Sequence, residues 1–276
     1  MFLIMATRRE FIRHISSASL VMLGGSVLKL TPADAAWLKK DVVLRFAVAS
    51  DGHYGEKNTD YVSFFETMTG QVTKFHQQNP LDFCVINGDI IHDEKDFLVP
   101  AKAQLDKLPV KYYVTKGNHD KVSDDYWNEF WGMPVNHDVA IKENVLLLAT
   151  TSNEKGEYLS PNLDWMKAKL EEHQQKKNVF VFVHIPQAKW AKFSLETPAF
   201  LEMMKEHKNI RGVFHGHEHE EDGVKMIGTV PYMFDSHFGG SWGTAYKGFR
   251  VVELMRDGSY LTYIMNPTKK INQASF

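Results

Sequence analysis

The chain has 276 residues, of which 43% are hydrophobic and 24% charged, a composition typical of a globular protein with one adequately buried core. Its formal net charge is −2. Because the first 36 residues carry four basic and two acidic side chains, the remaining chain is mildly acidic, which argues against a nucleic-acid groove as the main binding surface. Cys84 is the only cysteine, so an intramolecular disulfide and a thiolate metal cluster are excluded. Any metal must bind to His, carboxylate and amide side chains.

The N-terminal 36 residues have the pattern of an export signal. The features that coincide there are a twin-arginine block, a moderately apolar segment and a cleavage site of the A-x-A type, namely Arg8-Arg9, residues 15–30 and Ala33-Asp34-Ala35. The apolar segment is too short and too polar for a stable membrane span. The alternative is an amphipathic N-terminal helix with two surface arginines.

We therefore expect a twin-arginine signal peptide over residues 1–36, cleaved near Ala35 or Ala36, and one domain over residues 37–276. This signal resembles those of the bacterial route that exports folded proteins, which implies the twin-arginine translocation (Tat) machinery as a partner and a periplasmic or extracellular location. A lipoprotein anchor is excluded because no cysteine lies near the cleavage site, and we expect no stable membrane anchor. A protein that folds before export acquires its metal in the cytoplasm, where availability can decide which ion is bound.

Short apolar runs alternate with amphipathic helical stretches from residue 41 onward, which is typical of an α/β protein. In chain order, the pattern first predicts a strand (42–49), a helix that ends at Asn79-Pro80 (61–78), a strand (83–86), a helix (98–108) and a strand (111–114). Next come an aromatic helix (126–131) and a hairpin that turns at Glu143-Asn144 (139–149). They are followed by a helix opened by Ser160-Pro161 (160–177), a strand (179–183), a helix opened by Thr197-Pro198 (197–207) and a strand (210–214). The last four strands read as a terminal β meander: 224–227, 232–234, 249–254 and 261–265.

Five polar blocks follow the ends of five of these strands: Asp51-Gly52-His53, Gly88-Asp89, Gly117-Asn118-His119-Asp120, His184 and Gly216-His217-Glu218-His219. Each block alone is a weak signal. Because the carboxyl ends of strands and their loops converge on one crevice in open α/β sheets, the strand pattern predicts that all five lie along one edge of one sheet. Such a set of carboxylate, imidazole and amide groups can hold two divalent ions that orient a phosphoester and neutralise its charge.

These blocks together resemble the calcineurin-like metallophosphoesterase family, whose pattern D-x-H, G-D, G-N-H-[DE], H and G-H-x-H is present without a gap. The resemblance implies a two-sheet α/β/β/α sandwich with the active site at the carboxyl ends of the strands. It also implies that Asp89 bridges two ions, and that a hydroxide lies between them. The implied terminal ligands are Asp51, His53 and His219 for the first ion and Asn118, His184 and His217 for the second.

The resemblance further implies that His119 faces the substrate, where it can stabilise developing charge or protonate the leaving oxygen. Asp120 is a candidate for fixing the His119 tautomer. His92, three positions after Asp89, is a candidate partner of the site, whereas His215 has no place in the family pattern and is expected to be structural. All-N/O ligation suits Mn²⁺, iron or Zn²⁺, and four imidazoles disfavour Mg²⁺.

The predicted function is metal-dependent hydrolysis of a small phosphate monoester or diester. A cyclic-nucleotide phosphodiesterase is the more specific alternative. Two other classes are a non-catalytic metal-binding protein of the same fold and a metal-storage protein, for which the histidine cluster would suffice but Asp89, Asn118 and His119 would have no purpose.

Overall fold

The computed structural model describes residues 20–23, 26–29, 42–266 and 269–276. The predicted twin-arginine block and cleavage site lie outside these residues, so the leader and its cleavage remain predictions. Among residues 20–29, β1 (Leu20–Leu23) and β2 (Ser26–Lys29) pair antiparallel with each other, and β1 lies beside β14 (Lys269–Ser275). None of the helices that the structure describes has the length and apolar character of a membrane span.

The first large sheet has a parallel half and an antiparallel half. Its order is β14-β13-β12-β3-β4-β5, with β3, β4 and β5 parallel to one another. The strands besides β14 are β3 (Val42–Ala49), β4 (Phe83–Asn87), β5 (Tyr112–Thr115), β12 (Phe249–Met255) and β13 (Tyr260–Asn266).

The second large sheet has four parallel strands flanked by antiparallel edges. Its order is β10-β11-β9-β8-β7-β6, and both edge strands, β10 and β6, run antiparallel to their neighbours. The strands are β6 (Asn136–Ile141), β7 (Asn144–Ala149), β8 (Asn178–Val183), β9 (Ile210–His215), β10 (Val224–Ile227) and β11 (Val230–Phe234).

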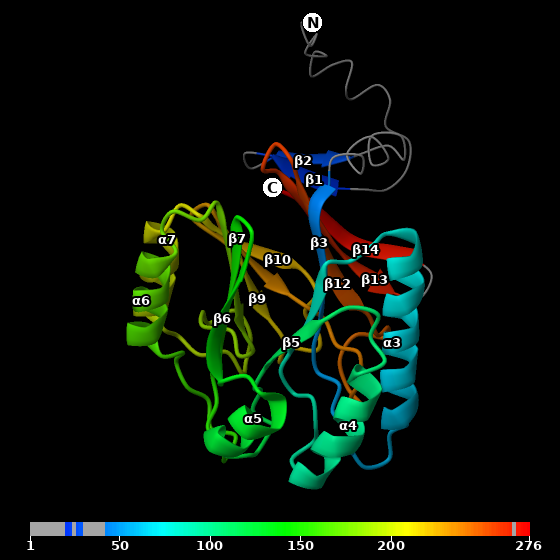
Figure 1. The fold of residues 1–276 in the computed structure, drawn as a ribbon. Coiled ribbons are helices and arrows are strands. Elements are labelled where there is room, and N and C mark those ends of the chain that lie inside the picture. The colour runs from blue at the N-terminus through cyan, green and yellow to red at the C-terminus, as the bar shows by residue number, and fades with distance from the viewer. Residues whose placement is uncertain (1–19, 24–25, 30–41, 267–268) are drawn as a thin grey trace, which may run out of the picture.

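Helices cover the outer faces of both sheets (Figure 1). On the first sheet pack α3 (Tyr61–Gln78), the 3₁₀ helix η2 (Lys95–Phe97), α4 (Leu98–Leu105) and α5 (Asp124–Trp131). On the second pack α6 (Leu163–Glu172) and α7 (Pro198–Glu206). The amphipathic pattern of these helices directs their apolar residues toward the sheets.

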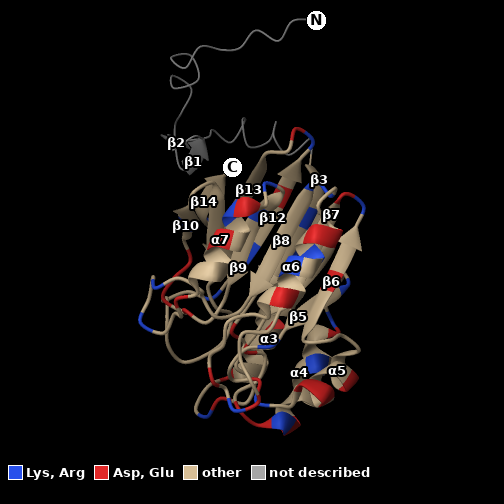
Figure 2. Cartoon of the chain, turned by 90° about the vertical axis from the view of Figure 1, so that its left-hand side faces the viewer, with Lys and Arg blue, Asp and Glu red and all other residues tan. Residues whose placement is uncertain are grey.

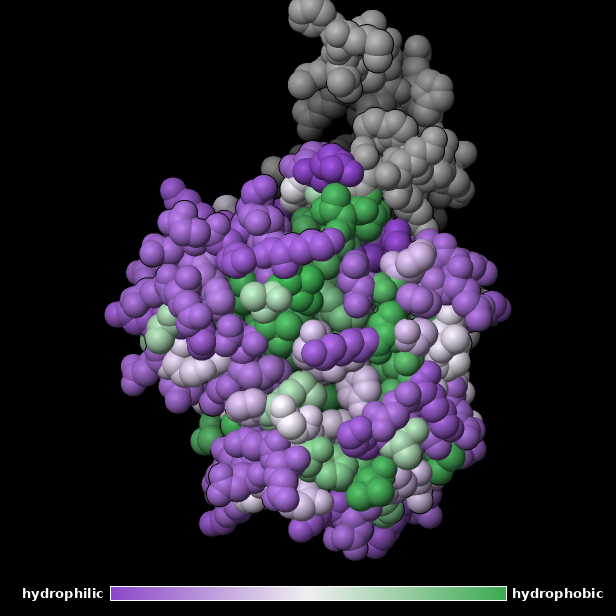
Figure 3. Space-filling view, in the orientation of Figure 1, coloured by the Kyte–Doolittle hydropathy of each residue, from purple (hydrophilic) through white to green (hydrophobic). Residues whose placement is uncertain are grey.

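The inner faces of the two sheets share an aromatic core. Leu44, Phe46 and Val48 alternate with Ala47 and Ala49 along β3, the first set facing the other sheet and the second set facing the helices. Phe46 stacks on Phe83 of its own sheet at 4.9 Å and meets Phe180 of the opposite sheet edge-on at 5.1 Å. Where the sheets meet, apolar side chains reach the surface between hydrophilic ones (Figure 3). The chain therefore forms the expected α/β/β/α sandwich.

Two sequence predictions about the elements are wrong. The helix predicted over 160–177 begins at Leu163, because the side chain of Asn162 caps it by accepting the N–H of Trp165, and it ends at Glu172. The four late strands do not form one meander. β10 and β11 join the second sheet and β12 and β13 join the first, because the loop between β11 and β12 crosses from one sheet to the other.

Candidate metal centre

The candidate residues follow strands of both sheets and meet between them. Asp51 and His53 follow β3, Asp89 follows β4, and Asn118 and His119 follow β5 of the first sheet. His184, His217 and His219 follow β8 and β9 of the second sheet. The prediction that the candidate residues follow the carboxyl ends of strands is thus confirmed. The prediction that all of them lie along one edge of one sheet is wrong. Each sheet supplies part of the cluster, since its parallel strands end at the same side of the sandwich.

One group of side chains consists of Asp51, His53 and His219, all buried. Nε2 of His53 lies 3.1 Å from Nε2 of His219, and the latter lies 3.2 Å from Oδ1 of Asp51. Ser50 donates its hydroxyl to the other oxygen of Asp51, which also receives the backbone N–H of His217 at 3.0 Å. These hydrogen bonds fix the orientation of the Asp51 carboxylate.

A second group consists of Asp89, His184 and His217. Asn118, the fourth candidate ligand of this ion, lies in the loop that follows β5. Oδ2 of Asp89 lies 3.2 Å from Nε2 of His184 and 3.8 Å from Nε2 of His53. Nδ1 of His184 lies 2.7 Å from the carbonyl oxygen of Asn87, to which it can donate its proton. One Asp89 oxygen therefore lies between the two groups, as a bridging ligand must.

Three buried polar atoms at this place make no hydrogen bond within the described structure: Oδ1 of Asn118, Nε2 of His217, and Nε2 of His184, which meets Asp89 and Asp51 only as ion pairs at 3.2 and 3.8 Å. Buried polar atoms are normally paired, because an unmade hydrogen bond costs about 1–3 kcal/mol. All three atoms are potential metal donors, and they belong to the three residues predicted as terminal ligands of the second ion. The donor set therefore fits a metal ion.

The backbone at the site adopts a conformation that most residues avoid. Asp51, His53, Asp89 and His217 have φ angles of 60°, 47°, 50° and 68°, in the left-handed region. Such strain is concentrated at functional sites. At Gly117, an added Cβ would collide with the carboxylate and the backbone nitrogen of Asp89, so only glycine lets this loop approach the candidate bridge.

The charges of the two groups depend on one another. Burial alone would raise the pKa of Asp51, but the imidazoles of His219 and His184 lower it to about 2. Burial would lower the pKa of His184, yet the carboxylates of Asp89 and Asp51 raise it to about 10. In contrast, burial lowers the pKa of His53 to about 3 and that of His217 to about 4. The two carboxylates thus favour positive charge at this place, which His184 carries when no ion is bound, whereas His53 and His217 are neutral, as metal ligation requires.

His119 is held beside the groups by a residue that the sequence did not single out. Its Nδ1 lies 2.9 Å from Oδ1 of Asp93, which also binds Nζ of Lys121 at 2.9 Å. The candidate for this role, Asp120, is turned away: its carboxylate accepts the backbone N–H groups of Ile91 and Gly117 at 3.0 and 2.9 Å. Residues 117–120 form a turn in which the Asp120 side chain points away from the His119 ring, so Asp93, 26 positions away, is the partner.

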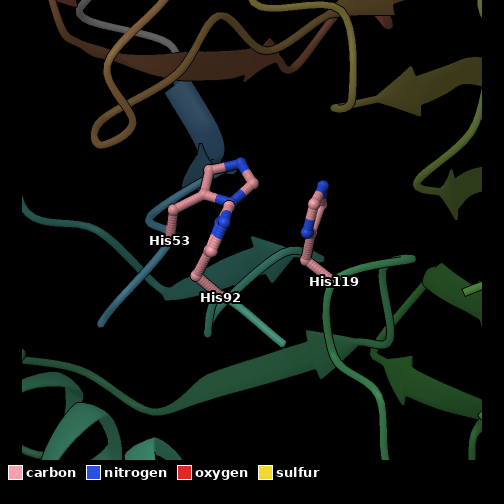
Figure 4. A group of neighbouring side chains, drawn as sticks. All are labelled: His53, His92 and His119. Carbon is pink, nitrogen blue, oxygen red and sulfur yellow. The ribbon is translucent and has the colours of Figure 1, made fainter. Parts of the chain in front are cut away.

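Other residues around the groups are mostly aromatic. His92 approaches His53 and stacks on His119 (Figure 4), with Nδ1 of His92 and Nδ1 of His53 3.1 Å apart. His215 is buried and bonds to the carbonyl oxygen of Val183 through Nδ1, as expected of a structural residue. Trp242, from the loop between β11 and β12, stacks on His219 at a ring distance of 4.3 Å. Tyr158 meets His217 edge-on at 4.8 Å, a contact that no local sequence pattern indicated.

The model of the calcineurin-like phosphoesterase family matches residues 44–221. The chain therefore belongs to this family. A comparison with curated proteins finds no match.

Solved structures show the same fold at low sequence identity. A dimetal phosphatase from Danio rerio has a TM-score of 0.69 at 15% identity, over 85% of this chain and 99% of that one. A purple acid phosphatase from yellow lupin (Lupinus luteus) seeds has a TM-score of 0.60 at 12% identity, over 86% of this chain and 54% of that one. GAP50 of Plasmodium, described as the anchor in the inner membrane complex, has a TM-score of 0.60 at 14% identity, over 83% of this chain and 88% of that one.

Proposed function

We propose that this protein is a metal-dependent phosphoesterase that holds two divalent ions. The observation that carries the proposal is the set of buried ligand-type atoms on Asn118, His184 and His217 that make no hydrogen bond within the described structure. A protein that holds no metal there would gain stability by pairing or replacing these groups. Their persistence beside a second group of buried ligand types, Asp51, His53 and His219, supports a pair of ion sites.

In this proposal Asp51, His53 and His219 hold the first ion, Asn118, His184 and His217 hold the second, and Asp89 bridges them. When bound, two such ions would activate water for attack and neutralise the charge of the phosphoryl group. The N/O donor set favours Mn²⁺, iron or Zn²⁺.

His119 supplies the proton in this proposal. In the imidazolium form of His119, Nδ1–H is donated to Asp93 and Nε2, on the other side of the ring, carries the second proton, which can pass to the leaving oxygen. The His119 backbone N–H bonds to Oδ1 of Asp89 at 2.8 Å, so the loop that carries the ring is tied to the candidate bridge. The ring of His119 is partly exposed, with 27% of the side chain accessible, and a substrate can therefore reach it.

The proposed substrate is a small phosphate monoester or diester, with a cyclic nucleotide as the more specific alternative. Basic and acidic side chains are interspersed on the face that carries α6 and α7 (Figure 2), which does not resemble a basic nucleic-acid surface. Phe193 and Trp242, which are 51% and 43% exposed, can contact an aromatic leaving group.

The decisive experiment is a turnover assay on the purified protein. With Mn²⁺, Fe²⁺ or Zn²⁺ present, we expect hydrolysis of p-nitrophenyl phosphate or bis(p-nitrophenyl) phosphate, and the ratio of the two rates separates monoesterase from diesterase. His119→Ala should reduce kcat by about 10²- to 10⁴-fold while two ions still bind. Two bound ions without turnover of either ester would reject the enzyme in favour of a non-catalytic metal-binding protein.

We also propose export by the twin-arginine route to the periplasm or the outside of the cell, on the sequence of the leader alone. Replacing Arg8 and Arg9 by Lys should retain the protein in the cytoplasm, as measured by cell fractionation, whereas replacing Arg13 by Lys should not. Unchanged export of the double variant would contradict the proposal.

A further inference from the structure

His92 lies between a candidate metal ligand and the candidate proton donor. Its Nδ1 is 3.1 Å from Nδ1 of His53, and its ring is parallel to that of His119, with centroids 4.7 Å apart and planes inclined by 14°. Figure 4 shows the three rings gathered from separate loops.

The contact with His53 determines which nitrogens carry protons. Nε2 of His53 faces Asp51, Asp89 and His219, at 3.9, 3.8 and 3.1 Å, so its lone pair must be free if this nitrogen is to bind an ion. The proton of a neutral His53 then resides on Nδ1, and its one hydrogen-bond acceptor within the described part of the chain is the Nδ1 lone pair of His92. His92 is thereby restricted to the tautomer with its proton on Nε2.

Histidine ligands usually donate their second nitrogen to a carboxylate, a backbone carbonyl or water. His184 follows that rule through the carbonyl of Asn87. His53 uses another imidazole, and this acceptor is itself fixed by the backbone. The N–H of His92 bonds to the carbonyl of Tyr54, and the N–H of Asp93 bonds to the carbonyl of His119, both at 2.9 Å.

We propose that His92 is a positioning residue with two separable contributions: its Nδ1 acceptor orients His53 toward the first ion, and its ring face orients His119. The proposal rests on the proposed two-ion function. It predicts that one side chain affects metal affinity and turnover through different atoms.

Two variants separate the contributions. His92→Asn retains an acceptor near the position of Nδ1 and removes the ring, whereas His92→Phe retains a ring and removes the acceptor. Mn²⁺ affinity is measured by calorimetry. Both His92 variants are also made in a His217→Ala background, in which the candidate ligands of the first ion, Asp51, His53 and His219, are intact. We expect His92→Phe to raise the Kd of the first ion by about 10- to 100-fold. We expect His92→Asn to leave this Kd within about threefold of the wild-type value but to lower kcat at saturating metal concentration.

His207→Ala is the matched control, because His207 lies at the end of α7 and bonds only locally, to the carbonyl of Met203. Circular dichroism confirms that each variant is folded. Equal loss of affinity in the Asn and Phe variants, or no loss in the Phe variant, would overturn the proposal. If the wild-type protein binds two ions but cleaves no ester, the proposed function fails, while the calorimetric comparison still decides the role of the His92 acceptor.

Discussion

Asp93 accepts the Nδ1–H of His119 at 2.9 Å, and the same carboxylate oxygen binds Lys121. Partial burial alone would raise the pKa of Asp93, but the hydrogen bonds from Lys121 and His119 lower it. The carboxylate is therefore ionised at neutral pH and holds the His119 ring with Nε2 directed away from Asp93. The pair acts as a unit although its members come from loops after different strands.

Replacing Asp93 by Asn should lower kcat by about 10- to 100-fold, since the orientation of His119 is lost. Metal stoichiometry should stay at the wild-type value because Asp93 belongs to neither ion group. Steady-state kinetics and metal analysis of the same samples test this. The exposed neighbour Asp96, replaced by Asn, is the control, and equal kcat in all three proteins would show that Asp93 does not act through His119.

Removing one candidate ligand should affect one ion. We expect Asn118→Ala and His217→Ala to bind a single ion tightly and to lose most of their turnover, because each removes a donor that has no other partner. Bound metal stabilises the folded state in proportion to the logarithm of its concentration over Kd. The rise in Tm with added Mn²⁺ should therefore be smaller in both variants, and an unchanged rise would argue against these ligands.

Gly117→Ala should destabilise the protein by about 1–3 kcal/mol, the usual range for overpacking, because its Cβ would displace the Asp89 carboxylate. Gly70, in α3, is the matched control: a Cβ there meets no atom within 4 Å. Gly70→Ala should stabilise the helix by about 0.5–1 kcal/mol. Urea unfolding measures both, and equal effects in the two variants would contradict the close approach at Gly117.

The single thiol reports on opening of the sandwich. Burial raises the pKa of Cys84 from 9.0 to about 12, so the folded protein retains the thiol proton more tightly than the unfolded chain. This contribution to stability is complete below pH 9 and is lost as the pH rises toward 12. At pH 8, Ellman's reagent should react with one thiol per chain in denaturant and only slowly in the native protein. Rapid reaction of the native protein would show that β4 is accessible.

The strand and helix patterns were largely readable, because each is determined by local periodicity and capping. Val42–Ala49 was predicted with the bounds that the structure gives, and Thr197-Pro198 does open α7. The helix at Asn162 was misplaced because Ser160-Pro161 is an equally good local signal, and only the hydrogen bond to Trp165 selects between them. The sequence does not predict which strands the last four strands pair with, since an apolar strand can pair with any exposed sheet edge.

The sequence by itself determined the residue types of the candidate site: five blocks of ligand-type residues, each after a strand, define a candidate donor set and place it at strand ends. Only the tertiary structure decided that these ends belong to two sheets, that Asp93 rather than Asp120 holds His119, and that His92 joins His53 to His119. The physical reason is that residue types and strand ends are local properties, whereas hydrogen-bond partners across loops depend on how the two sheets pack. Asp93 and His119 are 26 positions apart in the chain and 2.9 Å apart in the fold.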